Sequence, residues 1–317
     1  LLAAWALTRA AETGSRRCLL LAMALIGVAF NVKMLAAFVV LPTFVLVYLL
    51  GAPVGLRRRL LDLTLAGLVL SLVSVSWVTV FDLTPTDKRP YAGTTDSNSM
   101  LEMTVGPYGL GRFVRLTRPS AISATESGAG QTEATGAAAD AGRAAEPRPR
   151  SLVARLFVRT PVGPLRLADG QLAGQVGWLF PLVIAGLMLG AVREPLRRPL
   201  APAHLALMLW SGWVVTYAVV YSAAGGTFHF YYLATMAPPL AALAGIGVVR
   251  LWRWSVEGGW RACFVLVTLA LTAAWQLYID ARALDGYDGW QSWLHRALIG
   301  GTLAAVGVLA VSLLRRE

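Results

Sequence analysis

The 317-residue chain is 56% hydrophobic and only 14% charged, with a mean hydropathy of +0.61, which excludes an ordinary soluble domain. Its formal charge of +11 would suit nucleic acid if the basic residues shared one soluble face. They stand instead in short runs between apolar segments, as orientation signals do, so we expect no nucleic-acid partner. The composition predicts an all-α polytopic membrane protein.

The first residues, Leu1 to Thr8, resemble the end of a helix whose beginning is missing. They carry no charged region ahead of the apolar residues and so do not match a signal peptide. We therefore expect the sequence to be the later part of a longer protein.

The apolar run from Cys18 to Leu50 is too long for one span of about 20 residues, and Asn31 and Lys33 interrupt it. Arginines flank the run on both sides. The positive-inside tendency then places both ends in the cytoplasm, which requires two crossings. Lys33 is therefore expected at the outer surface.

The same charge rule orders the rest of the chain. Further spans are expected at residues 60–81, 171–192, 204–224, 230–249, 263–278 and 294–314. About eight transmembrane helices result, with residues 1–81 and 171–317 in the membrane and residues 82–170 forming one long external loop. We expect a multi-pass protein of the plasma membrane with this loop on the extracytoplasmic side.

The external loop divides into three parts. Residues 88–112, KRPYAGTTDSNSMLEMTVGPYGLGR, hold charges, amides, hydroxyls and glycines without a helical or alternating pattern. Residues 120–150 are rich in Ala, Gly, Ser and Thr, and we expect them to be disordered. Residues 151–169 are mixed apolar and basic, which is compatible with a short amphipathic element at the membrane interface.

Lys33 is the first candidate for a binding role, because a charge near the edge of a membrane helix is costly without a partner or ligand. One interpretation is a cation that faces an anionic ligand such as a phosphate. The other is a lysine that reaches toward the lipid headgroups. Neighbouring Asn31 favours the binding site, since a second polar residue adds to the cost.

The patterned loop holds further candidates, namely Arg89, Tyr91, Asp96, Asn98 and Arg112. Small hydroxyl and amide residues among glycines suit a loop that folds over a polar ligand such as a sugar. The two arginines could bind a phosphate. A solvated surface loop with arginines at lipid headgroups is the alternative. The glycine spacing matches no nucleotide-binding fingerprint.

The outer turn TFHFYYLATMAPP places His229, Tyr231 and Tyr232 at the start of a helix, which favours anions. An aromatic belt at the membrane interface is the alternative. Cys18 and Cys263 match no metal or redox spacing, and no His, Cys and carboxylate set has the spacing of a metal site. No cofactor is predicted, although the sequence leaves a divalent metal ion open.

Four segments together resemble bacterial members of the dolichyl-phosphate-mannose protein mannosyltransferase superfamily, of the aminoarabinose-transferase type with a GT-C membrane fold. These segments are GVAFNVKMLAAFVVLP, RPYAGTTDSNSMLEMTVGPYGLGR, PLRLADGQLAGQVGWLFPL and TFHFYYLATMAPPLAALAGIG. The resemblance covers most of the chain outside residues 120–150. Phe230 stands where many members have proline, and the low-complexity insertion is unusual.

The resemblance implies a membrane glycosyltransferase that takes a sugar from a polyprenyl-phosphate carrier and transfers it, with inversion, to a lipid or protein acceptor at the outer face. It implies that the carrier phosphate is bound by Lys33 and by Tyr231 or Tyr232, and that the polar loop borders the sugar cavity. We therefore assign to the lipid phosphate Lys33, Tyr231, Tyr232 and Arg89, and to the sugar and acceptor cavity Tyr91, Asp96, Asn98, Arg112 and His229.

The family's acidic catalytic motif lies in the first external loop, and that region would precede Leu1. We assign no catalytic residue within the chain. Asp96 is the nearest carboxylate, but we do not assign it the role of the base, so the chain alone is expected to be inactive. Two other functions remain open. One is a transporter or flippase for a lipid-linked sugar, which would have broken helices in paired repeats. The other is a non-catalytic membrane scaffold, in which the polar outer motifs would have no functional role.

Overall fold

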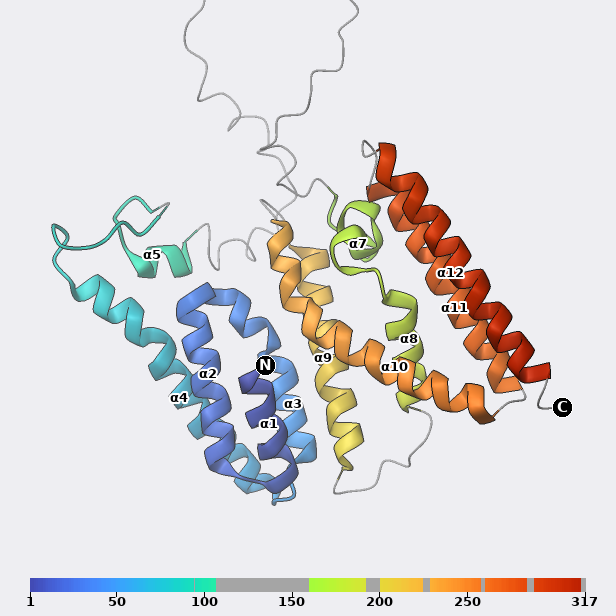
Figure 1. Ribbon diagram of the computed structural model, residues 1–317. Coiled ribbons are helices and arrows are strands. Elements are labelled where there is room, and N and C mark those ends of the chain that lie inside the picture. Colours follow the sequence, from blue (N-terminus) through green and yellow to red (C-terminus); the bar gives the residue numbers. More distant parts are fainter. Residues whose placement is uncertain are drawn as a thin grey trace, which may run out of the picture.

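The computed structural model describes residues 1–93, 95–106, 160–191, 200–224, 229–257, 260–283 and 288–314. These residues form long helices joined by short 3₁₀ segments, and most of the helices run roughly along one common direction (Figure 1). The predicted all-α polytopic membrane fold is confirmed.

The first part of the chain is a compact group of helices. Its elements are α1 (Leu2–Thr13), α2 (Arg16–Lys33), η1 (Met34–Val40), α3 (Leu41–Gly51) and α4 (Leu56–Leu83). Gly14 ends α1 in the left-handed conformation, with φ 68°, where glycine carries no Cβ penalty. The Ser15 hydroxyl then accepts the Cys18 N–H and caps α2.

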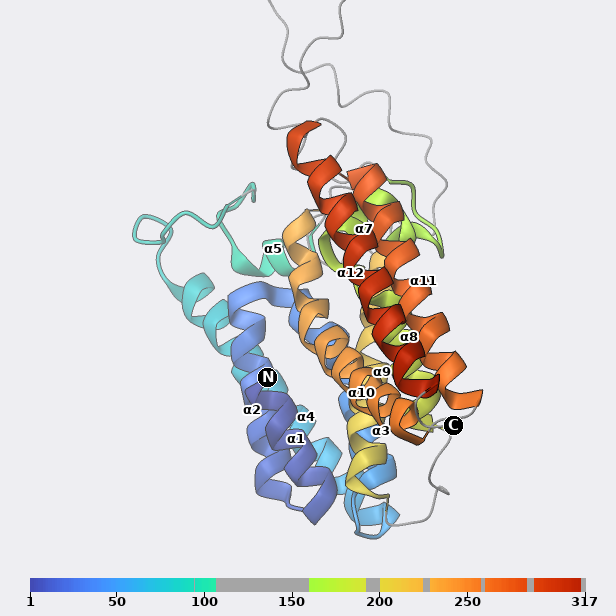
Figure 2. The same ribbon diagram turned by 45° about the vertical axis from the view of Figure 1, so that its right-hand side comes forward.

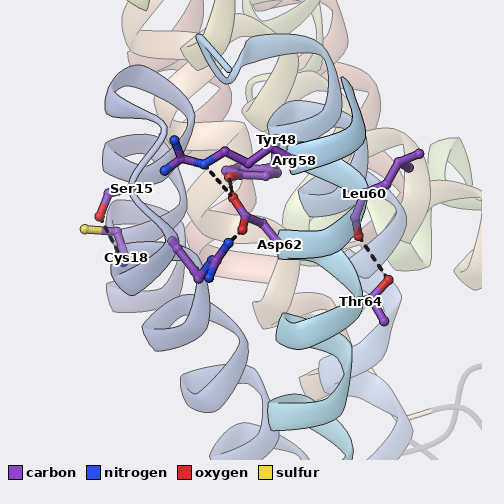
Figure 3. A network of polar contacts seen from close by, with 8 residues as sticks. Ser15, Cys18, Tyr48, Arg58, Leu60, Asp62 and Thr64 are labelled. Atoms are coloured by element: carbon purple, nitrogen blue, oxygen red, sulfur yellow. Dashed lines mark hydrogen bonds and ion pairs between the residues drawn. The ribbon is translucent and has the colours of Figure 1, made fainter. Parts of the chain in front are cut away.

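Helices α2 and α3 form a hairpin whose two ends meet at one buried carboxylate, Asp62 in α4 (Figure 3). Arg16, at the start of α2, lies 2.5 Å from Asp62 Oδ1, and the Tyr48 hydroxyl, near the end of α3, donates to Oδ2 at 2.9 Å. Arg58 Nε lies 3.7 Å from the same carboxylate. The apolar run 18–50 therefore folds into two helices whose outer ends lie together, as its flanking arginines indicated. Its orientation in the membrane stays a prediction.

The rest of the described chain begins with the short helix α5 (Met100–Val105) and continues from residue 160. It contains η4 (Arg166–Ala168), α7 (Gly170–Val176), α8 (Phe180–Ala191), α9 (Pro202–Ala223), η5 (Phe230–Met236), α10 (Ala237–Glu257), α11 (Trp260–Ala283) and α12 (Asp288–Leu314). Helices α11 and α12 lie side by side in both views (Figure 2), and His295 Nε2 lies 2.8 Å from Asp280 Oδ2 between them.

The span expected at residues 171–192 is broken. Helices α7 and α8 meet at an angle of 65°. At the break the Gly177 carbonyl accepts the Phe180 N–H and also the indole N–H of Trp275, the latter at 2.7 Å, while Gln276 Nε2 lies 3.3 Å from the Trp178 carbonyl. Backbone groups freed inside a membrane need such partners, and α11 supplies them.

Five helical segments of the described residues are long and apolar enough to cross a membrane, or six if the bent pair α7 and α8 is one span. The number of eight crossings stays a prediction. The expected disorder at residues 120–150 and the candidate Arg112 lie outside the described residues.

The expected interfacial element at residues 151–169 is described only from residue 160 onward, and there it packs against the end of α9. Arg166 is 5% exposed. Its guanidinium donates to the carbonyls of Tyr221 and Ala224 at 2.9 and 2.5 Å. Burial lowers the pKa of Arg166 from its usual value. This arginine therefore satisfies the last carbonyls of α9.

Candidate lipid-phosphate site

Lys33 lies where α2 stops. Met34, the next residue, has φ 32°, which a non-glycine residue rarely adopts, and the chain continues as the 3₁₀ segment η1. The break presents the Lys33 ammonium to η5, nearly 200 residues later in the sequence. Its Nζ lies 4.0 Å from the centroid of the Tyr231 ring and 4.4 Å from that of Tyr232. Both distances are typical of cation–π contacts.

His229 completes this group, which we call the Lys33 cluster: Lys33, His229, Tyr231 and Tyr232. The imidazole stacks on the Tyr231 ring at 5.3 Å and meets the Tyr232 ring edge-on at 5.7 Å. The two tyrosine rings are 4.7 Å apart. The structure therefore brings together four of the nine predicted site residues.

The charge of Lys33 has no acidic partner among the residues that the structure describes, and its ammonium makes no hydrogen bond to any of them. Aromatic faces attract a cation without neutralising it. Tyr231 is 59% exposed, so the cluster has an open side. An anion that entered there would meet an ammonium with unused N–H donors.

Two tyrosines of α9 hold the irregular segments of the site in place. The Tyr217 hydroxyl donates to the Ala36 carbonyl of η1 at 2.8 Å. One turn later the Tyr221 hydroxyl bonds the Tyr232 carbonyl at 2.9 Å and the Thr235 hydroxyl at 2.7 Å. Helix α9 therefore positions η1, which follows Lys33, relative to η5, which carries the tyrosines of the cluster.

Our sequence reasoning missed Tyr217 and Tyr221. The signal was present, because two phenols one helical turn apart lie within the span predicted at 204–224. A buried phenol in an apolar helix requires a hydrogen-bond partner. The sequence could not show that the partners would be backbone carbonyls of two 3₁₀ segments.

Replacing both hydroxyls, in Tyr217→Phe/Tyr221→Phe, is expected to lower the free energy of unfolding by about 2 kcal/mol. The first substitution removes the phenolic donor of the Ala36 carbonyl in η1. The second removes the bonds of Tyr221 to the Tyr232 carbonyl and the Thr235 hydroxyl in η5, where the Tyr232 carbonyl keeps only its bond from Thr235. Thermal unfolding in detergent checks this. Tyr91→Phe is the matched control for stability, since Tyr91 is 84% exposed. Equal melting temperatures for the double variant and the control would contradict the positioning role.

The external loop approaches the same place through α5. The Asp82 carboxylate, at the end of α4, accepts the Ser99 hydroxyl and the N–H groups of Met100 and Leu101, each at 2.9 Å. These bonds anchor the start of α5. The Thr104 hydroxyl on α5 then lies 3.9 Å from the Met34 sulfur, directly after Lys33 in the chain. The loop therefore borders the break in α2.

Arg89 and Asn98 hold the conformation of this loop. Arg89 Nε donates to the Thr84 carbonyl at 2.6 Å, and the same guanidinium also donates to the Asp82 carbonyl. Asn98 has φ 51°, and its amide group bonds the Ala92 N–H at 2.7 Å and the Pro90 carbonyl at 3.1 Å. Arg89 and Asn98 therefore stabilise the loop. Their predicted binding roles stay predictions.

The remaining loop candidates are placed at the surface. Tyr91 and Asp96 are exposed, and no described contact joins either side chain to the Lys33 cluster. Arg112 lies outside the described residues. The predicted sugar and acceptor cavity is therefore represented by His229 in the cluster, while its other members remain expectations.

The hydrogen bonds of the Glu102 carboxylate make the conformation of the loop depend on pH. Its carboxylate accepts the Ser97 hydroxyl and the N–H groups of Asp96 and Ser97, and these bonds lower the pKa of Glu102 from the usual 4.5. The stabilisation is present above pH 4.5 and is lost as the pH falls through the lowered pKa. We expect the amide resonances of Asp96 and Ser97 to shift with a midpoint below pH 4.5. A midpoint at or above that value would exclude these bonds.

A divalent metal ion does not fit this site. Within the described ranges no group of three or more His, Cys, Asp or Glu side chains could hold a metal ion. The carboxylates of Asp82 in α4 and Glu102 in α5 already accept hydrogen bonds from backbone N–H groups and hydroxyls.

The helices and the site together define an all-α polytopic membrane protein with a cation held at one end of its helices. The family model for dolichyl-phosphate-mannose-protein mannosyltransferase matches residues 1–78, which include Lys33. Two proteins of Bacillus subtilis strain 168 are similar over most of the chain. "Putative mannosyltransferase YkcB" is 30% identical over 98% of this chain and 51% of its own length. "Putative mannosyltransferase YycA" is 31% identical over 88% of this chain and 48% of its own length.

These similarities support a mannosyltransferase family of the GT-C-like type for this chain, as the four sequence segments indicated. It spans about half the length of the curated relatives it matches. No solved structure matches it.

Proposed function

We propose that the chain is the carrier-binding part of a membrane glycosyltransferase, which transfers a sugar from a polyprenyl-phosphate carrier, with inversion, to a lipid or protein acceptor at the extracytoplasmic face. The names of its relatives support the class of enzyme. The main support for a lipid-phosphate donor is the environment of the Lys33 ammonium. It lies 4.0 and 4.4 Å from the centroids of two tyrosine rings and has no acidic partner among the described residues.

The position of the cluster fits a lipid carrier. The C-terminal end of α2, whose last residue is Lys33, lies at the same end of the helices as α5 and α7 (Figure 1), and η5 contacts α7 there. The arginines at the starts of α2 and α4 lie at the opposite end, which the positive-inside rule assigns to the cytoplasm. A phosphate at the outer headgroup level would reach Lys33 while its prenyl chain stayed in the bilayer.

Lys33 also suits the chemistry of an inverting transfer. The acceptor hydroxyl attacks the anomeric carbon on the face opposite the phosphate, and the bond from that carbon to the phosphate oxygen breaks. Negative charge then develops on the leaving phosphate. An ammonium fixed beside it stabilises that charge more in the transition state than in the ground state. A base takes the proton of the hydroxyl, and we assign that role to no described residue.

One observation favours the transporter alternative, namely the break between α7 and α8, because transporters bind substrates at broken helices. At this break, however, Trp275 and Gln276 already occupy backbone carbonyls. Carbonyls that are satisfied by side chains offer less to a transported ion or sugar. The geometry therefore supports the transferase better.

Reconstitution of the full-length protein with a radiolabelled polyprenyl-phosphate sugar distinguishes the functions. Transfer of label to an acceptor supports the transferase. Movement of the labelled lipid across the bilayer without transfer would establish the transporter instead. A protein that does neither, while folded and inserted, would refute both functions and leave the scaffold.

A further inference from the structure

A cavity lies at the end of the helices opposite the Lys33 cluster, between α8, α9 and α10. It has a volume of about 400 Å³. Its polar lining includes His204 near the start of α9 and Arg250 and Arg253 in the last part of α10. The proposed transferase function does not use it.

The two arginines make this cavity cationic. Neither Arg250 nor Arg253 has a hydrogen bond or an ion pair with any residue in the described ranges. They are three residues apart and therefore lie on neighbouring positions of one helical face. By contrast, Arg16, Arg58 and Arg59, at the same end of the helices, are held by Asp62 or by backbone carbonyls. The cavity thus holds two guanidinium groups whose donors no described residue uses.

The rest of the lining is apolar and small. Leu207, Ile246 and Val249 supply hydrocarbon surface, and Val249 is 52% exposed. Gly245 opens the space further, because a Cβ atom built there would meet nothing within 4 Å. A free inorganic phosphate would not use this apolar surface, whereas a lipid with an anionic headgroup would use both parts of the lining.

The place in the fold agrees with a lipid. Arg250 lies thirteen residues beyond Ala237, the first residue of α10, or about 20 Å at about 1.5 Å per residue. The cavity is therefore separated from the Lys33 cluster by most of a bilayer's hydrocarbon thickness. Trp252, between the two arginines in sequence, is 70% exposed, as expected for a tryptophan at the membrane interface.

We propose that this cavity binds an anionic glycerophospholipid of the opposite leaflet, with its headgroup phosphate between Arg250 and Arg253 and part of an acyl chain against Leu207, Ile246 and Val249. The bound lipid fills the space between α9 and α10 and neutralises the two arginines. This site is independent of the proposed sugar transfer, and its test needs no sugar donor.

The test measures lipid binding by the purified chain in detergent, with native mass spectrometry and thermal unfolding. Phosphatidylglycerol, phosphatidylcholine and inorganic phosphate are added separately. We expect phosphatidylglycerol to be retained and to raise the melting temperature, with little effect of the other two. The variant Arg250→Gln/Arg253→Gln is expected to bind phosphatidylglycerol about tenfold more weakly.

Two further variants make the test specific. Arg17→Gln/Arg57→Gln removes the same charge from exposed arginines at the same end of the helices, outside the cavity, and is expected to bind as the wild type does. Gly245→Leu keeps both arginines but fills the space, and should also lose the lipid. Undiminished binding by the Arg250→Gln/Arg253→Gln variant would overturn the proposal, and so would equal stabilisation by inorganic phosphate.

Discussion

Lys33→Gln is expected to weaken binding of a polyprenyl phosphate to the chain by about tenfold to a hundredfold. Glutamine has a similar length but no charge, so the two tyrosine rings would no longer hold a cation 4.0 and 4.4 Å from their centroids. A phosphate would then lose a charge-assisted hydrogen bond and the attraction of the ammonium. The dissociation constant in lipid nanodiscs measures this loss.

Lys88, the other lysine of the chain, provides the matched control. It lies in the loop on the predicted outer side and is exposed. Lys88→Gln removes the same charge from the same side of the membrane, outside the Lys33 cluster, and should change the dissociation constant less than twofold if direct contact rather than general attraction is responsible. If both substitutions weakened binding of the polyprenyl phosphate equally, general electrostatic attraction, and not direct contact with Lys33, would explain the binding.

Gly247→Ala is expected to lower the free energy of unfolding by about 2 kcal/mol. Helices α8 and α10 cross at Gly186 and Gly247. A Cβ atom on Gly247 would lie 2.6 Å from the Leu182 carbonyl oxygen, and one on Gly186 would lie 2.2 Å from that of Leu243. Backbone atoms cannot move aside as a side chain can, so the helices must separate. Small residues permit this close approach in membrane proteins.

Gly245, two residues earlier in α10, gives a control with the opposite sign. A Cβ atom there would contact nothing within 4 Å, and alanine favours a helix over glycine by up to about 1 kcal/mol. Gly245→Ala should therefore leave stability unchanged or raise it. Unfolding of both variants in the same detergent decides the matter, and a Gly247→Ala protein as stable as Gly245→Ala would refute the close crossing.

The general architecture could be predicted because the length of each apolar run and the arginines beside it can be read directly from the sequence. The hairpin of α2 and α3 follows from a run too long for one span with basic residues at both ends. The break between α7 and α8 was missed, since residues 171–192 read as one apolar span. Pro181 was a signal, because it cannot donate to the Gly177 carbonyl. That carbonyl is satisfied by Trp275 of a distant helix, which no local pattern reveals.

In the candidate site, the sequence indicated four residues that the structure brings together, but it did not indicate the contacts between them. Lys33 and the tyrosines could be assigned to one side of the membrane, but their contact depends on Tyr217 and Tyr221, which fix η1 and η5 from a third helix. Arg89 illustrates the limit. Arg89 donates to the carbonyls at the end of α4. The sequence alone cannot distinguish such a structural arginine from one that binds a phosphate.

Photo-crosslinking tests the central claim most directly. A polyprenyl phosphate with a photoreactive group beside its phosphate is bound to the chain in nanodiscs, irradiated and mapped by mass spectrometry. We predict label on residues 229–236 and on the segment around Lys33, removed by excess unlabelled polyprenyl phosphate and strongly reduced in Lys33→Gln. Label that is confined to other helices, or that persists undiminished in Lys33→Gln, would contradict the assignment of the Lys33 cluster to the lipid phosphate.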